Sequence, residues 1–93
     1  MIHFVVHVVG DGVGVVVVEG VKQGQELTGW IMEDVKEIRI TAKSAIPSGH
    51  KLALKDYKPG DTVIKYGVDI GKVVKPIGCG EHLHVHNVKT KRW

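Results

Sequence analysis

Three histidines alternate near the end of the chain, at positions 82, 84 and 86. Successive side chains of a strand point to opposite faces, so an extended segment places these three imidazoles on one face. Neighbouring residues of such a row lie roughly 6.5–7 Å apart at Cα, and two imidazoles at this spacing can bind one divalent ion. The row His82, His84 and His86 is therefore a candidate metal site, provided that the strand bends if all three are to share an ion. A polar outer face, or an interface with another subunit, would show the same pattern.

Other polar residues offer weaker candidates. Cys79 lies three residues before His82, which suits a metal ligand, but a single loop cysteine is more often incidental. His50 shares a strand face with Leu52 and Leu54, which favours a partly buried structural role. Structural interpretations are also simpler for four further residues: His7, Lys65, Tyr66 and Asp69. The chain has no glycine-rich phosphate loop before a helix, no Ser-His-Asp signal and no paired-cysteine zinc motif.

The elements that would position these residues are short strands. Valine dominates the apolar runs, and β-branched residues suit pleated surfaces better than helices. We predict an all-β fold without a convincing helix, apart from a single turn near 55–57. The expected strands cover residues 2–9, 13–18, 27–32, 36–41, 50–54, 62–66, 72–74 and 82–88. In the last of these, Leu83 and Val85 would face the core.

One pattern recurs four times: an apolar residue, two residues, a glycine, two residues and a second apolar residue. Its glycines are Gly24, Gly49, Gly60 and Gly80, whose uneven spacing excludes a solenoid. Glycine tolerates a positive φ, so each copy predicts a tight turn immediately before a strand. Repeated corners between short strands favour a small, folded-over β structure of one domain spanning residues 1–93.

Composition limits the function. A chain of 93 residues buries only a modest core, so any active site would borrow surface from a partner. The net charge of +3 is concentrated in the basic ending at Lys89, Lys91 and Arg92, but no aromatic ladder accompanies it, so we expect no nucleic-acid partner. No apolar run reaches the ~20 residues of a membrane helix, and the single cysteine favours a reducing cytoplasm. Exposed strand edges make a homo-oligomer plausible.

Several motifs together resemble a known family. They are the segment from Ile46 to Asp56, with Ile46-Pro47-Ser48-Gly49-His50-Lys51; the segment from Gly60 to Gly67, followed by Ile70-Gly71-Lys72; and the ending from Gly80 to Lys89. In this order and spacing they resemble the SAF-type β-clip domain of altronate and galactarate dehydratases. The early His7, Gly10-Asp11 and Val13-Gly14-Val15, with the Asn87 to Trp93 ending, resemble most the branch in which this domain is a separate small subunit of (R)-sulfolactate sulfo-lyase.

The resemblance implies a lyase that removes water or bisulfite from a hydroxy acid. It also implies a separate large lyase subunit and a divalent metal, iron or another, shared with that subunit. By the same resemblance, His50, His84 and His86 are the expected catalytic residues, and His82, His84 and His86 the expected metal ligands. Which histidine acts as base and which as ligand stays open. Two alternatives also stay open: a carbohydrate- or partner-binding module without catalysis, and a small metal-handling protein.

Overall fold

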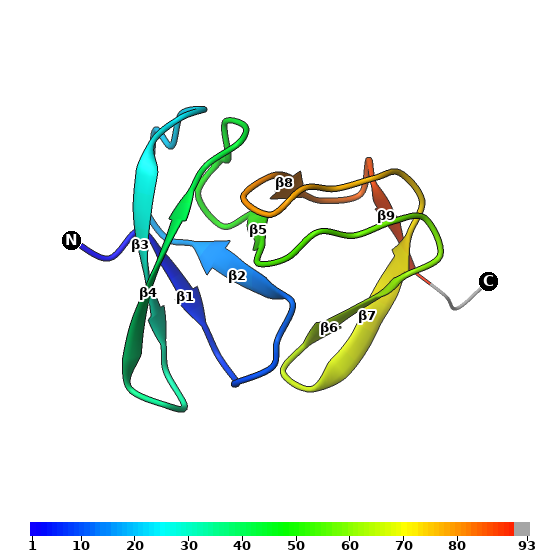
Figure 1. The fold of residues 1–93 in the computed structure, drawn as a ribbon, viewed down its shortest axis with the longest axis horizontal. Coiled ribbons are helices and arrows are strands. Elements are labelled where there is room, and N and C mark those ends of the chain that lie inside the picture. Colours follow the sequence, from blue (N-terminus) through cyan, green and yellow to red (C-terminus); the bar gives the residue numbers. More distant parts are fainter. Residues whose placement is uncertain (91–93) are drawn as a thin grey trace.

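The computed structural model describes residues 1–90, and these form nine short strands and no helix (Figure 1). Six strands build one sheet in the order β4-β3-β1-β2-β5-β8, and three build a second in the order β6-β7-β9. The strands of the larger sheet are β1 (Phe4–Val6), β2 (Val13–Val16), β3 (Glu26–Ile31), β4 (Lys36–Thr41), β5 (Lys51–Ala53) and β8 (His82–Leu83). Those of the smaller sheet are β6 (Thr62–Lys65), β7 (Val68–Val73) and β9 (Val88–Lys89). The predicted all-β class is confirmed. The basic ending at positions 91 and 92 lies outside the described residues.

The main difference from the sequence expectation lies in the last strand. The predicted strand over 82–88 is wrong, because β8 ends at Leu83 and a turn over 84–87 leads into β9. Leu83 is buried as expected, but Val85 is 67% exposed and does not face the core. The turn replaces the strand because the amide N–H groups of Asn87 and Val88 both donate to the carbonyl of His84.

Two hydrophobic clusters form the core, and two strands join them. The first contains Phe4, Val6, Val16, Val21, Leu27, Ala42, Ile46 and Leu52, and the second contains Val13, Ala53, Tyr57, Val63, Val73, Ile77 and Leu83. Strand β2 places Val13 in the second cluster and Val16 in the first. Strand β5 likewise divides Leu52 and Ala53 between them. The segment 50–53 is therefore held from both sides.

The four glycine turns predicted from the sequence all form. Gly24, Gly49, Gly60 and Gly80 have φ values of 88°, 85°, 98° and 92°, as position three of a type II turn requires. In every copy the amide of the residue after the glycine donates to the carbonyl three residues earlier, over 2.9–3.2 Å. The apolar residues that flank each copy are all buried: Val21 and Leu27, Ile46 and Leu52, Tyr57 and Val63, and Ile77 and Leu83. Val21 bridges to Ile46 and Tyr57 bridges to Ile77, so the turns associate in pairs.

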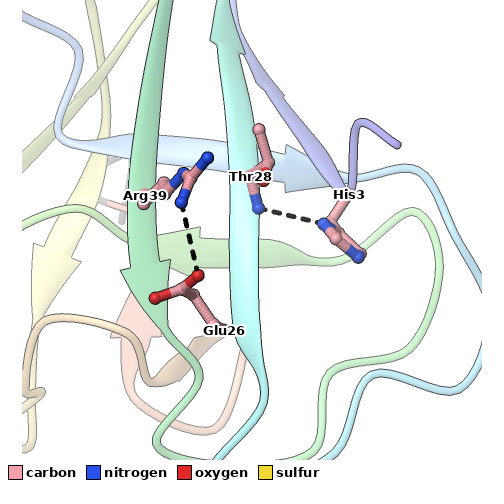
Figure 2. Close-up of polar contacts among 4 residues, drawn as sticks. All are labelled: His3, Glu26, Thr28 and Arg39. Carbon is pink, nitrogen blue, oxygen red and sulfur yellow. Dashed lines mark hydrogen bonds and ion pairs between the residues drawn. The ribbon is translucent and has the colours of Figure 1, made fainter.

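Two polar side-chain contacts join strands β1, β3 and β4 of the larger sheet (Figure 2). His3 lies just before β1, where its Nδ1 accepts a hydrogen bond from the amide of Thr28 in β3 at 2.9 Å. Arg39 of β4 and Glu26 of β3 form an ion pair of 3.7 Å on the exposed side of the same sheet. The hydrogen bond of His3 supports the pairing of β1 with β3. The ion pair contributes at most about 1 kcal/mol to stability, because both of its side chains are exposed.

Residues 1–90 contain no helical segment that could span a membrane.

Candidate functional site

Strand register brings two distant histidines together. Lys51 of β5 pairs with Leu83 of β8, and Leu52 pairs with His82. In an antiparallel ladder, one further step places His50 directly opposite His84, and side chains of opposed residues share a face. The rings of His50 and His84 accordingly stack, with centroids 4.1 Å apart. The pairing of β5 with β8 therefore builds the centre of the site.

His82 completes a cluster of three imidazoles with His50 and His84, which we call the histidine cluster. His50 Nδ1 and His82 Nε2 lie 2.8 Å apart, a hydrogen bond in which one ring donates and the other accepts. The rings of His82 and His84 are nearly parallel, at 13° and 5.6 Å between centroids. One ring nitrogen from each of the three lies within 4.8 Å of the others. Three neutral imidazoles that converge in this way form a nitrogen donor set suited to a divalent transition-metal ion.

The turn before β5 explains why the side chain of His50 is free to join the cluster. In the other three glycine turns, the residue after the glycine accepts a hydrogen bond from the first amide of its own turn. These acceptors are Gln25, Asp61 and Glu81, bonded to the amides of Lys22, Lys58 and Gly78. The equivalent first residue of the fourth turn is Pro47, which has no amide hydrogen. His50, which occupies the acceptor position, therefore has no such donor to bind and points to His82 instead.

Asn87 holds the loop that carries His84. Its side chain is buried, its Oδ1 accepts from the amide of His84 at 2.9 Å, and its Nδ2 donates to the carbonyl of His82 at 2.9 Å. On the other side, the amide of His82 donates to Ser44 Oγ at 2.8 Å. The backbone around two of the three imidazoles is thus fixed by side chains, which preorganises the histidine cluster.

The cluster favours neutral imidazole. Burial lowers the pKa of His82, and the nearby rings of His86, His50 and His84 lower it further. Burial also lowers the pKa of His84, as do His50, Lys51 and His86. Neutral imidazole is the form that binds a metal ion or accepts a proton, so both residues are in the competent form at neutral pH.

We expect acid to destabilise the fold through His82. Above pH 6.5 its imidazole is neutral in both the folded and the unfolded chain, so the free energy of unfolding does not depend on it. As the pH falls below 6.5, the unfolded chain takes up the proton first, because the folded-state pKa is lowered, and stability declines until the folded protein is protonated as well. Urea unfolding at several pH values should show a shallower decline for His82→Gln than for the natural chain. Equal declines would contradict the lowered pKa.

The geometry favours His50 over His86 as the third member of the cluster. His86 is exposed on the turn and is not one of the three converging imidazoles, although its ring lies 5.0 Å from that of His82. The alternation in the sequence predicts that His86 lies in line with His82 and His84, but the strand that would align it ends at Leu83.

The remaining residues that the sequence offered as candidates lie outside the histidine cluster and have packing or backbone contacts instead. Burial raises the pKa of the Cys79 thiol, and Cys79 is not among the converging ligands. His7 stacks on Tyr66 at 4.2 Å, and Lys65 lies over the same ring. Tyr66 has a φ of 56°, which its amide hydrogen bond to the buried Asp11 carboxylate supports.

Two hollows flank the histidine cluster. One, of about 290 Å³, lies beside His84 and is lined by Lys51, Ile70, Leu83, Val85, Val88 and Thr90 as well. The other, of about 360 Å³ and more open, lies beside His82 and is lined by Gly20, Val21, Ala45, Ile46 and Pro47. Both hollows are open to the surface, so the cluster is accessible to a ligand or to a partner's side chains.

Sequence comparisons agree with this structure. The family model of the altronate/galactarate dehydratase SAF domain matches residues 2–91. The chain is 62% identical over 92 residues to (2R)-sulfolactate sulfo-lyase subunit alpha of Chromohalobacter salexigens, covering 99% of this chain and 98% of that protein. It is 57% identical over 63 residues to the subunit of the same name from Paracoccus pantotrophus, covering 68% of this chain and 94% of that protein. It is 47% identical over 53 residues to altronate dehydratase of Bacillus subtilis, covering 57% of this chain but 11% of that enzyme. A single family thus accounts for nearly the whole described fold, and the chain belongs to the altronate/galactarate dehydratase SAF domain family.

Proposed function

We propose that this chain is the small subunit of a lyase that cleaves a hydroxy acid, with (R)-sulfolactate as the first substrate to test. The observation that carries the proposal is its 62% identity to a subunit alpha of sulfolactate sulfo-lyase, over 98% of that subunit's length. The word subunit in that name supports a separate large partner, and the small size of the chain supports the same conclusion. The single free cysteine, Cys79, supports a reducing cytoplasm as its location.

The histidine cluster provides the groups that such an elimination needs. A base takes the proton from the carbon next to the carboxylate, and sulfite or water leaves from the following carbon to give an enol, which becomes a 2-keto acid. Neutral imidazole accepts a proton efficiently near pH 7. We assign the base to His84 or its stacked partner His50, because both rings are only partly buried and face the same surface. His86, at the edge of the cluster, plays a lesser part.

The same cluster suits a divalent metal ion. As an alternative to acting as bases, His50, His82 and His84 would hold it, since their ring nitrogens converge and the lowered pKa of His82 and His84 keeps those two rings deprotonated. A ring that ligates the ion is not free to take the substrate proton, so the two roles exclude each other for any one histidine. When bound, such an ion polarises the oxygen atoms of a substrate or stabilises negative charge that develops on them. Three protein ligands leave coordination positions for the large subunit or the substrate to fill.

We expect the chain to bind Zn²⁺ or Co²⁺ through these three residues. Alanine in place of His50, His82 or His84 should weaken binding at least about tenfold, because each removes one ligand. His86→Ala should weaken it less. Titration calorimetry at about pH 7.5 measures the affinity, which should fall as the pH drops below 6.5 and protons compete for the rings. An affinity that depends on His86 more than on His50 would contradict this ligand set.

The proposed reaction is tested by co-expressing the chain with its large subunit and assaying a panel of hydroxy acids. The panel should contain (R)-sulfolactate, altronate, galactarate and lactate, with 2-keto acid formation as the readout and sulfite release as a second readout. Turnover of sulfolactate, altronate or galactarate supports a lyase, whereas lactate, which has no leaving group on the following carbon, is the negative control. Sulfite release from sulfolactate assigns the carbon–sulfur branch, and keto-acid formation from altronate or galactarate the dehydratase branch. Co-purification of a large partner without turnover of any member would favour a binding module instead.

A further inference from the structure

The hollow beside His84 combines an apolar wall with one cationic side chain. Ile70, Leu83, Val85 and Val88 form the wall, while Lys51, His84 and Thr90 supply the polar groups. Its volume of about 290 Å³ is at the lower limit of small-molecule sites, which are commonly about 300–1,000 Å³. A ligand of three to six carbon atoms would suit this space better than a large cofactor.

Strand pairing fixes the position of Lys51. It lies in β5 opposite Leu83 of β8 and opposite Val15 of β2, so its backbone is held from both sides. Alternation along β5 separates its side chain from those of His50 and Leu52 and directs it to the side of the hollow. No ion pair joins Lys51 to a carboxylate within the described residues. A half-buried lysine that pairs with no carboxylate of residues 1–90, beside an apolar wall, attracts an anion more strongly than an exposed lysine does.

The surrounding half of the chain strengthens this attraction. Residues 51–93 contain nine Lys and Arg residues against four Asp and Glu, whereas residues 1–50 contain four against six. In the sheet next to the hollow, Lys72 and Lys89 are directly opposed across β7 and β9. Like charges at opposed positions repel each other, and no carboxylate within residues 1–90 forms an ion pair with either lysine. An excess of one sign around a hollow raises the local concentration of ligands of the opposite sign.

We propose that this hollow is the subsite for the carboxylate end of the substrate, and that Lys51 is the residue that binds that carboxylate. The inference rests on the proposed lyase function and names a specificity-determining residue for it. His84 lines the same hollow as Lys51, so a carboxylate held at Lys51 places its neighbouring carbon, which loses a proton in the elimination, within the hollow that His84 borders. The apolar wall packs against the carbon skeleton.

Kinetics of the assembled pair test the proposal. Lys51→Met removes the charge and keeps the length of the side chain, and it should raise KM about tenfold to a hundredfold, with a smaller change in kcat. Lys51→Arg should restore most of the affinity. Lys58→Met is the matched control, because it removes one charge from the same half of the chain at an exposed turn that does not line the hollow. An unchanged KM for Lys51→Met in an active, folded pair would overturn the inference and leave the lyase proposal standing.

A binding measurement on the full chain separates the two proposals. Sodium lactate is the anionic probe and propane-1,2-diol the neutral one, and amide signals of Val85 and Val88 are followed by NMR. Lactate should shift these signals in the natural chain but not in Lys51→Met, and the diol should not shift them. If the pair turns over no hydroxy acid, the lyase proposal fails, and the spectra alone then test the anion subsite. The subsite is overturned if lactate shifts no signal in the natural chain, or if it shifts the signals equally in Lys51→Met. A third outcome would also contradict the inference. If the large subunit protects the amides of Val85 and Val88 from hydrogen exchange and lactate does not shift their signals, a side chain of the partner fills the hollow.

Discussion

Replacing His84 with alanine should reduce turnover by the assembled pair about 10²–10⁴-fold while leaving the fold intact, as expected for loss of a proton-transfer group. The His84 ring stacks on His50, lies near His82 and borders the hollow that contains Lys51. The loop is held by the backbone amide of His84, which donates to Asn87 Oδ1, and alanine keeps this amide. Circular dichroism and the thermal midpoint should therefore change little, and steady-state rates of keto-acid formation measure the loss.

Two matched variants make this result specific. His7→Ala removes an imidazole that stacks on Tyr66, outside the histidine cluster, and should retain turnover within about twofold. His86→Ala removes a ring at the cluster's edge and should cost much less than His84→Ala, because His86 is exposed and does not converge with the others. Full activity of His84→Ala would remove the cluster from the mechanism. Equal losses for His84 and His86 would favour the alternating row of the sequence over the cross-strand cluster.

Replacing Gly80 with alanine should destabilise the chain by about 2–5 kcal/mol and displace His82. Gly80 has a φ of 92°, which costs an L-residue about 1–2 kcal/mol, and an added Cβ would overlap the carbonyl oxygen of Thr41. The Gly80 amide also donates to Ala53, and its carbonyl accepts from Lys43. Because small domains are stable by only about 5–15 kcal/mol, urea unfolding should show a large loss.

Gly60→Ala is the control for the contact as distinct from the backbone strain. Gly60 has a φ of 98° in the equivalent turn, but an added Cβ has no neighbour within 4 Å. Its cost should therefore be limited to about 1–2 kcal/mol. Similar losses at both positions would show that the contact with Thr41 contributes nothing, and that strain at positive φ explains the whole effect.

Local patterns in the sequence predict much of the fold. Alternating valine-rich segments predict the strands because pleated backbone alternates its side chains, and the recurring glycine predicts the turns because position three of a type II turn requires a positive φ. Both effects act within about seven residues. The failure at 82–88 has a local cause as well: the buried Asn87 bonds to the backbone of His82 and His84 and closes a turn where the alternation alone predicts a strand. Asparagine is a common turn residue, so Asn87 was the available signal.

The candidate site is harder to predict because it depends on pairing between distant strands. The sequence places His82, His84 and His86 in a row, whereas the structure groups His50, from 32 residues earlier, with the first two. That exchange follows from the register in which Leu52 pairs with His82, which no local pattern specifies. Pro47 is a signal in the sequence for the position of His50. Of the four glycine turns, only the one that starts at Pro47 has a first residue without an amide hydrogen, so the side chain of His50 has no donor within its own turn. Ser44 offers no such signal.

The most direct test of the central claim is reconstitution from separately purified subunits. This chain, the large subunit and a 1:1 mixture of the two are each assayed for 2-keto acid formation from (R)-sulfolactate and the sugar acids. We expect turnover only in the mixture, and turnover about 10²–10⁴-fold slower when the mixture contains His84→Ala in place of the natural chain. Full turnover by the large subunit alone would contradict the claim that these imidazoles complete its site.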